Sequence, residues 1–162
     1  MLQIFKKKSK TERVLKAPAD GKAVPMTEAK DETFSSCMLG SGVVICPENG
    51  VVKAPCDGEI TVFMKDSKHA VGIKTGFGLE LLLHIGVDTV TLKGEGFESQ
   101  LKQGMKVKAG DVLVRFDKEL VEAKGLNTDV IMIVMDGENM PEVEYQTGMD
   151  VTAGETVVAR VK

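Results

Sequence analysis

The sequence predicts an all-β fold: a compact β-sandwich or barrel with two related halves and little helix. Short segments rich in Val and Ile alternate with Pro and Gly clusters, a pattern typical of strands joined by tight turns. The core must be built from Val, Ile, Leu and Met, because the 162 residues include no Trp, one Tyr and six Phe. Only residues 98–103 and 118–124 could each form a short helical turn.

Two pairs of similar segments indicate the related halves. KAPADGKAV at residues 16–24 returns as KAPCDGEIT at residues 53–61. GMKVKAGDVLV at residues 104–114 returns as GMDVTAGETVV at residues 148–158. The spacing is too irregular for a solenoid, so the segments predict one compact domain with an internal repeat.

The charge distribution separates a basic N-terminus from an acidic body. We expect a flexible tail over residues 1–14 and a single domain over residues 15–162. The first 16 residues carry six cations and one carboxylate, a net of +5, so the remainder carries −8 within the total of −3. An acidic body disfavours nucleic acid as a partner. The tail begins with the apolar MLQIF and is either a solvated terminus or a weak contact for an anionic membrane surface.

Hydropathy and cysteine usage predict a cytoplasmic protein. No apolar run reaches membrane-spanning length, and the N-terminus lacks the long apolar segment of a signal peptide. The three cysteines, Cys37, Cys46 and Cys56, contain no C-x-x-C pair. Three free thiols suit a reducing cytosol better than a disulfide framework.

The segment LELLLHIGVDTV at residues 79–90 places one of the chain's two histidines inside a predicted strand. Odd-numbered positions from 79 to 85 are all apolar and therefore form the core face. His84 points away from that face, which predicts that it lies in a surface depression.

The second histidine, His69, precedes another predicted strand, and T-G-F-G at residues 75–78 is the turn between the two strands. A turn centred between Gly76 and Phe77 pairs residues whose numbers sum to 153, so that His69 faces His84. This register predicts β-carbons about 5 Å apart. A shift of one residue would place the histidines on opposite faces.

Two facing imidazoles suit phosphoryl transfer better than metal binding or hydrolysis, although a purely structural role is the alternative. Two ligands are too few for a closed zinc site, and neither Glu80 nor Asp88 completes a ligand pattern. The chain has no G-x-S-x-G elbow and no cysteine tied to a histidine. In phosphoryl transfer, one imidazole attacks phosphorus while the other donates a hydrogen bond to the phosphoryl oxygens. Apolar surroundings keep the attacking nitrogen unprotonated and exclude water.

KHAVGI at residues 68–73, followed by LELLLHIGVDTVTLKGEGF at residues 79–97, strongly resembles the glucose-type enzyme IIA family of the bacterial phosphoenolpyruvate-dependent sugar phosphotransferase system. The similarity starts near Val14 and includes APADG, KAPCDG, the F-x-x-x-x-x-G-x-G of residues 34–42 and the V-x-x-G-[DE] elements near the C-terminus. The family fold is an antiparallel β-sandwich with an internally duplicated motif, which agrees with the repeated segments.

The resemblance implies a phosphotransferase component without cofactor or metal. His84 would accept a phosphoryl group from the histidine phosphocarrier protein and pass it to a cysteine on the IIB domain of a sugar permease. His69 would steady the phosphoryl group without carrying it. Ser67 stands where the family usually has a threonine that orients one of the histidines. We expect a monomer.

The resemblance also implies a docking surface around the site. Four apolar residues, which would otherwise be expected in the core, match the family's collar: Phe34, Met38, Leu39 and Leu82. Asp88 is either a rim residue that meets a partner's arginine or a turn cap. The alternative function is a regulatory binding module that docks on metabolic enzymes or transporters and is switched by phosphorylation of His84.

The sequence departs from the family pattern near the site. DETFSS at residues 31–36 replaces a more apolar segment, and FMKDSKHA at residues 63–70 is one residue longer than the family loop. We expect these changes to alter partner preference rather than phosphoryl transfer. With no permease segment attached, the initiating MLQIF favours a free-standing IIA over a fragment of a larger permease.

Overall fold

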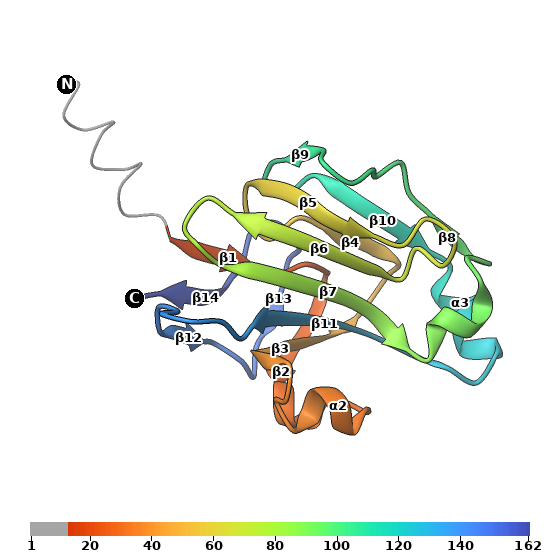
Figure 1. The fold of residues 1–162 in the computed structure, drawn as a ribbon. Helices are drawn as coiled ribbons and strands as arrows, with labels where there is room; N and C mark the ends of the chain where they lie inside the picture. Colours follow the sequence, from red (N-terminus) through yellow and green to blue (C-terminus); the bar gives the residue numbers. More distant parts are fainter. Residues whose placement is uncertain (1–12) are drawn as a thin grey trace.

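The computed structural model describes residues 13–162, which form antiparallel sheets with little helix (Figure 1). The elements, in chain order, are β1 (Val14–Lys16), β2 (Gly21–Pro25), the 3-10 helix η1 (Met26–Glu28), α2 (Glu32–Ser35), β3 (Gly40–Pro47), β4 (Val51–Lys53), β5 (Gly58–Phe63), β6 (Ala70–Thr75), β7 (Glu80–Val87), the 3-10 helix η2 (Thr89–Leu92), β8 (Phe97–Glu98), β9 (Lys106–Val107), β10 (Val112–Phe116), α3 (Lys118–Ala123), β11 (Asn127–Met135), β12 (Val143–Tyr145), β13 (Asp150–Val151) and β14 (Val157–Val161). The predicted all-β class is confirmed. No helix in this part of the chain is long and apolar enough to cross a membrane.

An eight-stranded sheet carries the histidine strand near its middle. Its strand order is β13-β2-β3-β11-β7-β6-β5-β9, and two three-stranded sheets have the orders β1-β14-β12 and β4-β10-β8. One buried cluster contains residues of all three sheets, including Leu15 of β1, Leu83 of β7 and Leu113 of β10. The sheets therefore share a single core, as in a sandwich.

The repeated segments hold each other in place by reciprocal backbone hydrogen bonds. The N–H of Lys16 donates to the carbonyl of Pro55 over 2.8 Å. The equivalent residue of the second segment, Lys53, donates to the carbonyl of Pro18 over 2.8 Å. The two segments of the predicted internal repeat thus donate equivalent backbone hydrogen bonds to each other.

The aspartates of the two repeats also have equivalent partners. The Asp20 carboxylate accepts from the N–H of Ala153 over 2.7 Å. The Asp57 carboxylate accepts from the N–H of Ala109 over 2.9 Å. The strands that follow the two repeats are also paired equivalently: β2 pairs with β13, and β5 pairs with β9.

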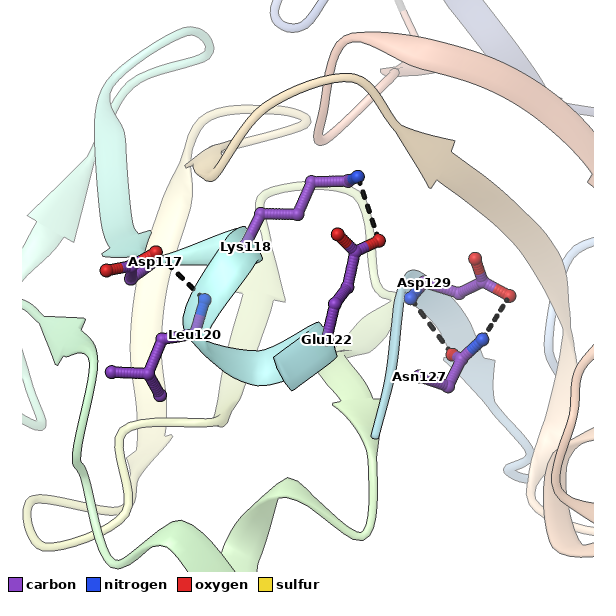
Figure 2. Close-up of polar contacts among 6 residues, drawn as sticks. All are labelled: Asp117, Lys118, Leu120, Glu122, Asn127 and Asp129. Carbon is purple, nitrogen blue, oxygen red and sulfur yellow. Dashed lines mark hydrogen bonds and ion pairs between the residues drawn. The ribbon is translucent and has the colours of Figure 1, made fainter. Parts of the chain in front are cut away.

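Of the two predicted helical turns, one is confirmed and the other is wrong. The first corresponds to α3, which begins at the side chain of Asp117, an acceptor for the N–H of Leu120 at 3.1 Å. Lys118 and Glu122 form an ion pair of 3.0 Å along it, while the neighbouring Asn127 bonds Asp129 at the start of β11 (Figure 2).

Residues 98–103 do not form a helix. The hydroxyl of Ser99 donates to the carbonyl of Leu113 over 2.6 Å and accepts from the N–H of Leu101 over 3.1 Å. The first bond fastens the segment to β10, and the second is local, so the serine hydroxyl satisfies a backbone N–H without a helix.

The predicted tail over residues 1–14 lies outside the described residues except for its last two. Val14 already belongs to β1 and pairs with Arg160 of β14.

Candidate functional site

The hairpin of β6 and β7 has a different register from the predicted one. Ala70, and not His69, is the cross-strand partner of His84, so paired residue numbers sum to 154. The predicted two-residue turn is wrong because the loop has three residues, 76–78, closed by the hydrogen bond from the N–H of Thr75 to the carbonyl of Leu79 at 2.9 Å. A left-handed glycine at the end of such a loop is common, and Gly78 has a φ of 88°.

The two histidines nevertheless meet, because His69 lies before β6 and does not follow its alternation. Lys68 has a φ of 56° and redirects the chain at this point. The carbonyl of His69 accepts from the N–H of Ile85 over 2.7 Å. Its ring lies edge-on to that of His84, with centroids 4.8 Å apart and planes at 84°.

The predicted alternation of β7 is confirmed. Leu79, Leu81, Leu83 and Ile85 are all at most 2% exposed and belong to the main core. His84 lies on the opposite face and is half-buried.

The face of β7 that carries His84 is covered by a second apolar cluster, which we term the collar. Its buried members are Met26, Phe34, Val44, Ile131 and Ile133, and Leu39 and Leu82 are among the partly buried residues that pack against them. The ring of Phe34 lies 4.9 Å from that of His84, measured between centroids. Of the four residues predicted to form a docking surface, Phe34, Leu39 and Leu82 pack in this cluster, whereas Met38 is 75% exposed and lies outside it.

A backbone carbonyl determines which nitrogen of His84 is available for reaction. Nδ1 of His84 lies 2.8 Å from the carbonyl oxygen of Gly86. A carbonyl can only accept a hydrogen bond, so Nδ1 carries the proton and Nε2 has the free lone pair. Gly86 reaches this position with a φ of 74°, a conformation that a side chain disfavours.

A hydroxyl orients the second histidine. Nδ1 of His69 lies 2.7 Å from Oγ of Ser67. His69 is 4% exposed and Ser67 is 6% exposed, so water does not compete strongly for this hydrogen bond. The geometry leaves Nε2 of His69 as the nitrogen that is not bonded to the hydroxyl.

Burial keeps both imidazoles neutral near pH 7. Desolvation, helped by repulsion from His84, lowers the pKa of His69 to about 4. Desolvation also lowers the pKa of His84, although the carbonyl of Gly86 and the carboxylates of Asp31 and Asp88 oppose this shift. A neutral, partly dry imidazole with an open Nε2 is suited to attack an electrophile such as phosphorus.

Asp88 is exposed and directly follows β7. Its backbone precedes η2 with a φ of 62°, but its side chain makes no capping hydrogen bond. The turn-cap interpretation of Asp88 is therefore wrong, and its carboxylate remains available at the rim.

Sequence reasoning overlooked Asp31 and the carbonyl of Gly86. The side chain of Asp31 caps α2 by accepting from the N–H of Thr33 over 2.8 Å, and α2 in turn carries Phe34. An acidic residue directly before a short polar segment is a helix-start signal that could have revealed it. The role of Gly86 depends on its backbone carbonyl, and every residue has one, so the residue type does not predict this role.

Within residues 13–162, no three or more His, Cys, Asp or Glu side chains are grouped closely enough to hold a metal ion.

Comparison with known proteins gives consistent matches along the chain. Residues 13–140 match the family described as phosphoenolpyruvate-dependent sugar phosphotransferase system, EIIA 1. A relative from Halalkalibacterium halodurans, named PTS system glucose-specific EIIA component, is 44% identical over 95% of this chain and 88% of its own length. A Bacillus anthracis protein of the same name is 39% identical over 98% of this chain and 96% of its own. The structure of glucose permease IIA from Mycoplasma capricolum superposes with a TM-score of 0.80 at 39% identity, covering 92% of this chain and 95% of the other.

Proposed function

Because this chain belongs to the EIIA 1 family of the phosphoenolpyruvate-dependent sugar phosphotransferase system, we propose that His84 is the residue that carries its phosphoryl group. The protein is a phosphotransferase component, a phosphoryl carrier in sugar transport, and as such works with a phosphocarrier and a IIB or permease partner. The observation that carries the assignment to His84 is the hydrogen bond from its Nδ1 to the carbonyl of Gly86, which leaves Nε2 free.

In the first step, Nε2 of His84 attacks the phosphorus of the phosphohistidine on the histidine phosphocarrier protein. The phosphorus–nitrogen bond of the donor breaks, and its electron pair returns to the donor imidazole. In the second step, a cysteine thiolate of the IIB domain attacks the same phosphorus. The bond to Nε2 then breaks, and its electron pair returns to the ring of His84.

His69 supports this exchange without becoming phosphorylated. When the hydroxyl of Ser67 donates to Nδ1 of His69, the proton of His69 lies on Nε2. That N–H can donate to a phosphoryl oxygen on the neighbouring His84, whose ring centroid lies 4.8 Å away. A positioned donor in a partly dry site stabilises the charge that spreads over these oxygens.

The surroundings of His84 serve two purposes in this proposal. Packing of Phe34 against the ring of His84 excludes water that would hydrolyse the phosphohistidine. Asp31 and Asp88, whose charges act on His84, supply carboxylates at the rim for a cationic side chain of the partner. We further propose a cytoplasmic location, which is supported by the three free cysteines.

The proposal is tested by incubating the protein with phosphoenolpyruvate, enzyme I and the histidine phosphocarrier protein and then measuring its intact mass. We expect a gain of one acid-labile phosphoryl group in the wild type and in His69→Gln, but not in His84→Gln. A well-characterised IIA run in parallel verifies the donor proteins. Phosphorylation of His84→Gln, or no uptake by the wild type beside an active control, would overturn the assignment.

A further inference from the structure

Thr89 is a fully buried polar residue that the steps of phosphoryl transfer described above do not use. It is the first residue of η2, and its hydroxyl donates a hydrogen bond to the carbonyl of Ile85, four residues earlier in the chain. Ile85 lies between His84 and Gly86, whose carbonyl oxygen lies 2.8 Å from Nδ1 of His84. The hydroxyl of Thr89 therefore holds the backbone at the point where the orientation of His84 is set.

The backbone between Ile85 and Thr89 contains two left-handed residues. Gly86 has a φ of 74° and Asp88 has a φ of 62°. The second conformation is unfavourable for a residue with a side chain, so contacts elsewhere must stabilise it. The hydrogen bond from the hydroxyl of Thr89 to the carbonyl of Ile85 spans this turn and closes it.

The carbonyl of Gly86 needs support from its surroundings because glycine is the most flexible residue. Glycine adopts positive and negative φ about equally well, so its own conformational preference does not fix the direction of the carbonyl. If the carbonyl turned away from His84, Nδ1 would lose the acceptor that keeps the proton on it. The proton could then move to Nε2, and the nitrogen that attacks phosphorus would lose its free lone pair.

Two groups occupy the space that a side chain of Gly86 would need. A β-carbon on Gly86 would lie 2.5 Å from Cγ2 of Thr89 and 2.5 Å from the carbonyl oxygen of Asn127. Asn127 is itself held at the start of β11, because its side chain accepts from the N–H of Asp129 over 2.9 Å and donates to the Asp129 carboxylate over 3.3 Å (Figure 2). Thr89 thus uses its hydroxyl on the peptide before Gly86 and its methyl group on Gly86 itself.

We propose that Thr89 is a positioning residue for phosphoryl transfer: its buried hydroxyl holds the peptide between Ile85 and Gly86, so that the Gly86 carbonyl keeps the proton of His84 on Nδ1 and leaves Nε2 free. This inference rests on the proposed function of His84. Thr89 acts through the backbone and takes no part in the chemical steps. The hydroxyl is the essential group, because it alone makes a directed bond to the peptide that precedes Gly86.

The test separates the hydroxyl from the rest of the side chain. Thr89→Val removes the hydroxyl and keeps the branched shape, while Thr89→Ser keeps the hydroxyl and Thr89→Ala lacks it on a similarly small side chain. Thr75→Val is the matched control, since Thr75 is 4% exposed and its hydroxyl donates to the carbonyl of Leu79 over 3.1 Å in the loop between β6 and β7.

Heteronuclear NMR spectroscopy of the folded, unphosphorylated proteins at about pH 7 reports which nitrogen of His84 is protonated, with His84→Gln used to assign the signals. Urea unfolding measures the stability of each variant. Single-turnover uptake from the phosphorylated histidine phosphocarrier protein supplies the rate.

We expect His84 to be protonated on Nδ1 in the wild type, Thr89→Ser and Thr75→Val. In Thr89→Val and Thr89→Ala, a substantial fraction should be protonated on Nε2, and phosphoryl uptake should be about fivefold slower. Thr75→Val should lose at least as much stability as Thr89→Val and yet keep the wild-type rate.

Three results would overturn the inference: a wild-type proton position in both hydroxyl-free variants of Thr89, an equal change in Thr75→Val, or a Thr89→Ser variant as defective as Thr89→Ala. A wild-type protein that accepts no phosphoryl group would instead refute the proposed function, and the NMR comparison would still test the role of Thr89.

Discussion

The backbone conformation of Gly86 yields the most specific prediction. In Gly86→Ala, the new β-carbon would lie 2.5 Å from the carbonyl oxygen of Asn127 and 2.5 Å from Cγ2 of Thr89. Thr89 is fully buried and its hydroxyl donates to the carbonyl of Ile85, so it cannot move aside. The substitution also adds a side chain at a φ of 74°.

The magnitude follows from two separable costs. A left-handed conformation costs a non-glycine residue about 1 kcal/mol, and an inserted carbon without space costs about 2 kcal/mol more. We therefore expect Gly86→Ala to lower the free energy of unfolding by about 3 kcal/mol. Gly78→Ala is the matched control, since Gly78 has a φ of 88° but no atom within 4 Å of the added carbon. It should lose only about 1 kcal/mol.

Urea unfolding of both variants measures these costs, and the phosphorylation rate supplies a second readout. The carbonyl of Gly86 must shift to admit the methyl group, which loosens its hydrogen bond to His84 and should slow phosphoryl uptake. Gly78→Ala should be phosphorylated at the wild-type rate. The reasoning fails if the two variants lose the same stability within about 0.5 kcal/mol, because the contacts around Gly86 would then be irrelevant.

Three further predictions concern hydrogen bonding, pH and thiol reactivity. Ser67→Ala removes the hydrogen bond to His69 and should slow single-turnover phosphoryl uptake up to about tenfold. Ser67→Thr keeps the hydroxyl and should retain the wild-type rate. Equal rates of phosphoryl uptake in the two variants would contradict an orienting role of Ser67. The pKa of His69 is about 4 in the folded protein and about 6.5 in the unfolded chain. Between these two pH values the unfolded chain binds one more proton than the folded protein. The free energy of unfolding should therefore fall by up to about 3 kcal/mol as the pH drops from 6.5 to 4. Urea unfolding of His69→Gln should show a smaller fall over this range, and an identical fall would exclude His69 as its source. Burial raises the pKa of Cys56 to about 12, so iodoacetamide at pH 8 should label exposed Cys37 long before Cys56. Peptide mass spectrometry measures the labelling of each cysteine, and equal labelling of the two would contradict this prediction.

The sequence was sufficient for the parts of this fold that depend on periodicity and repetition. The apolar positions of β7 repeat every second residue, so the core face and the outward direction of His84 could be predicted. The repeated APADG and APCDG segments predicted the related halves. The collar residues Phe34, Leu39 and Leu82 came from the family resemblance, because their contact with the face of His84 requires long-range pairing.

The features that escaped prediction depend on single backbone dihedral angles. T-G-F-G is compatible with loops of two or three residues, and the choice rests on the left-handed Gly78. The prediction that the two histidines meet was right although its register was wrong, since Lys68 redirects the chain before β6. A positive φ at a lysine is rare, so no sequence pattern predicts it.

The reciprocal bonding of the two halves has a consequence for synthesis on the ribosome. Val14 in β1, among the first described residues to emerge, pairs with Arg160, which is translated 146 residues later. Neither repeat can close alone, because Lys16 requires Pro55 and Lys53 requires Pro18. At about 5 to 20 residues per second, translation from Val14 to Arg160 takes about 7 to 30 s, and the edge of β1 stays unpaired during this time. Nascent chains of this protein should therefore depend on chaperones until β14 is released.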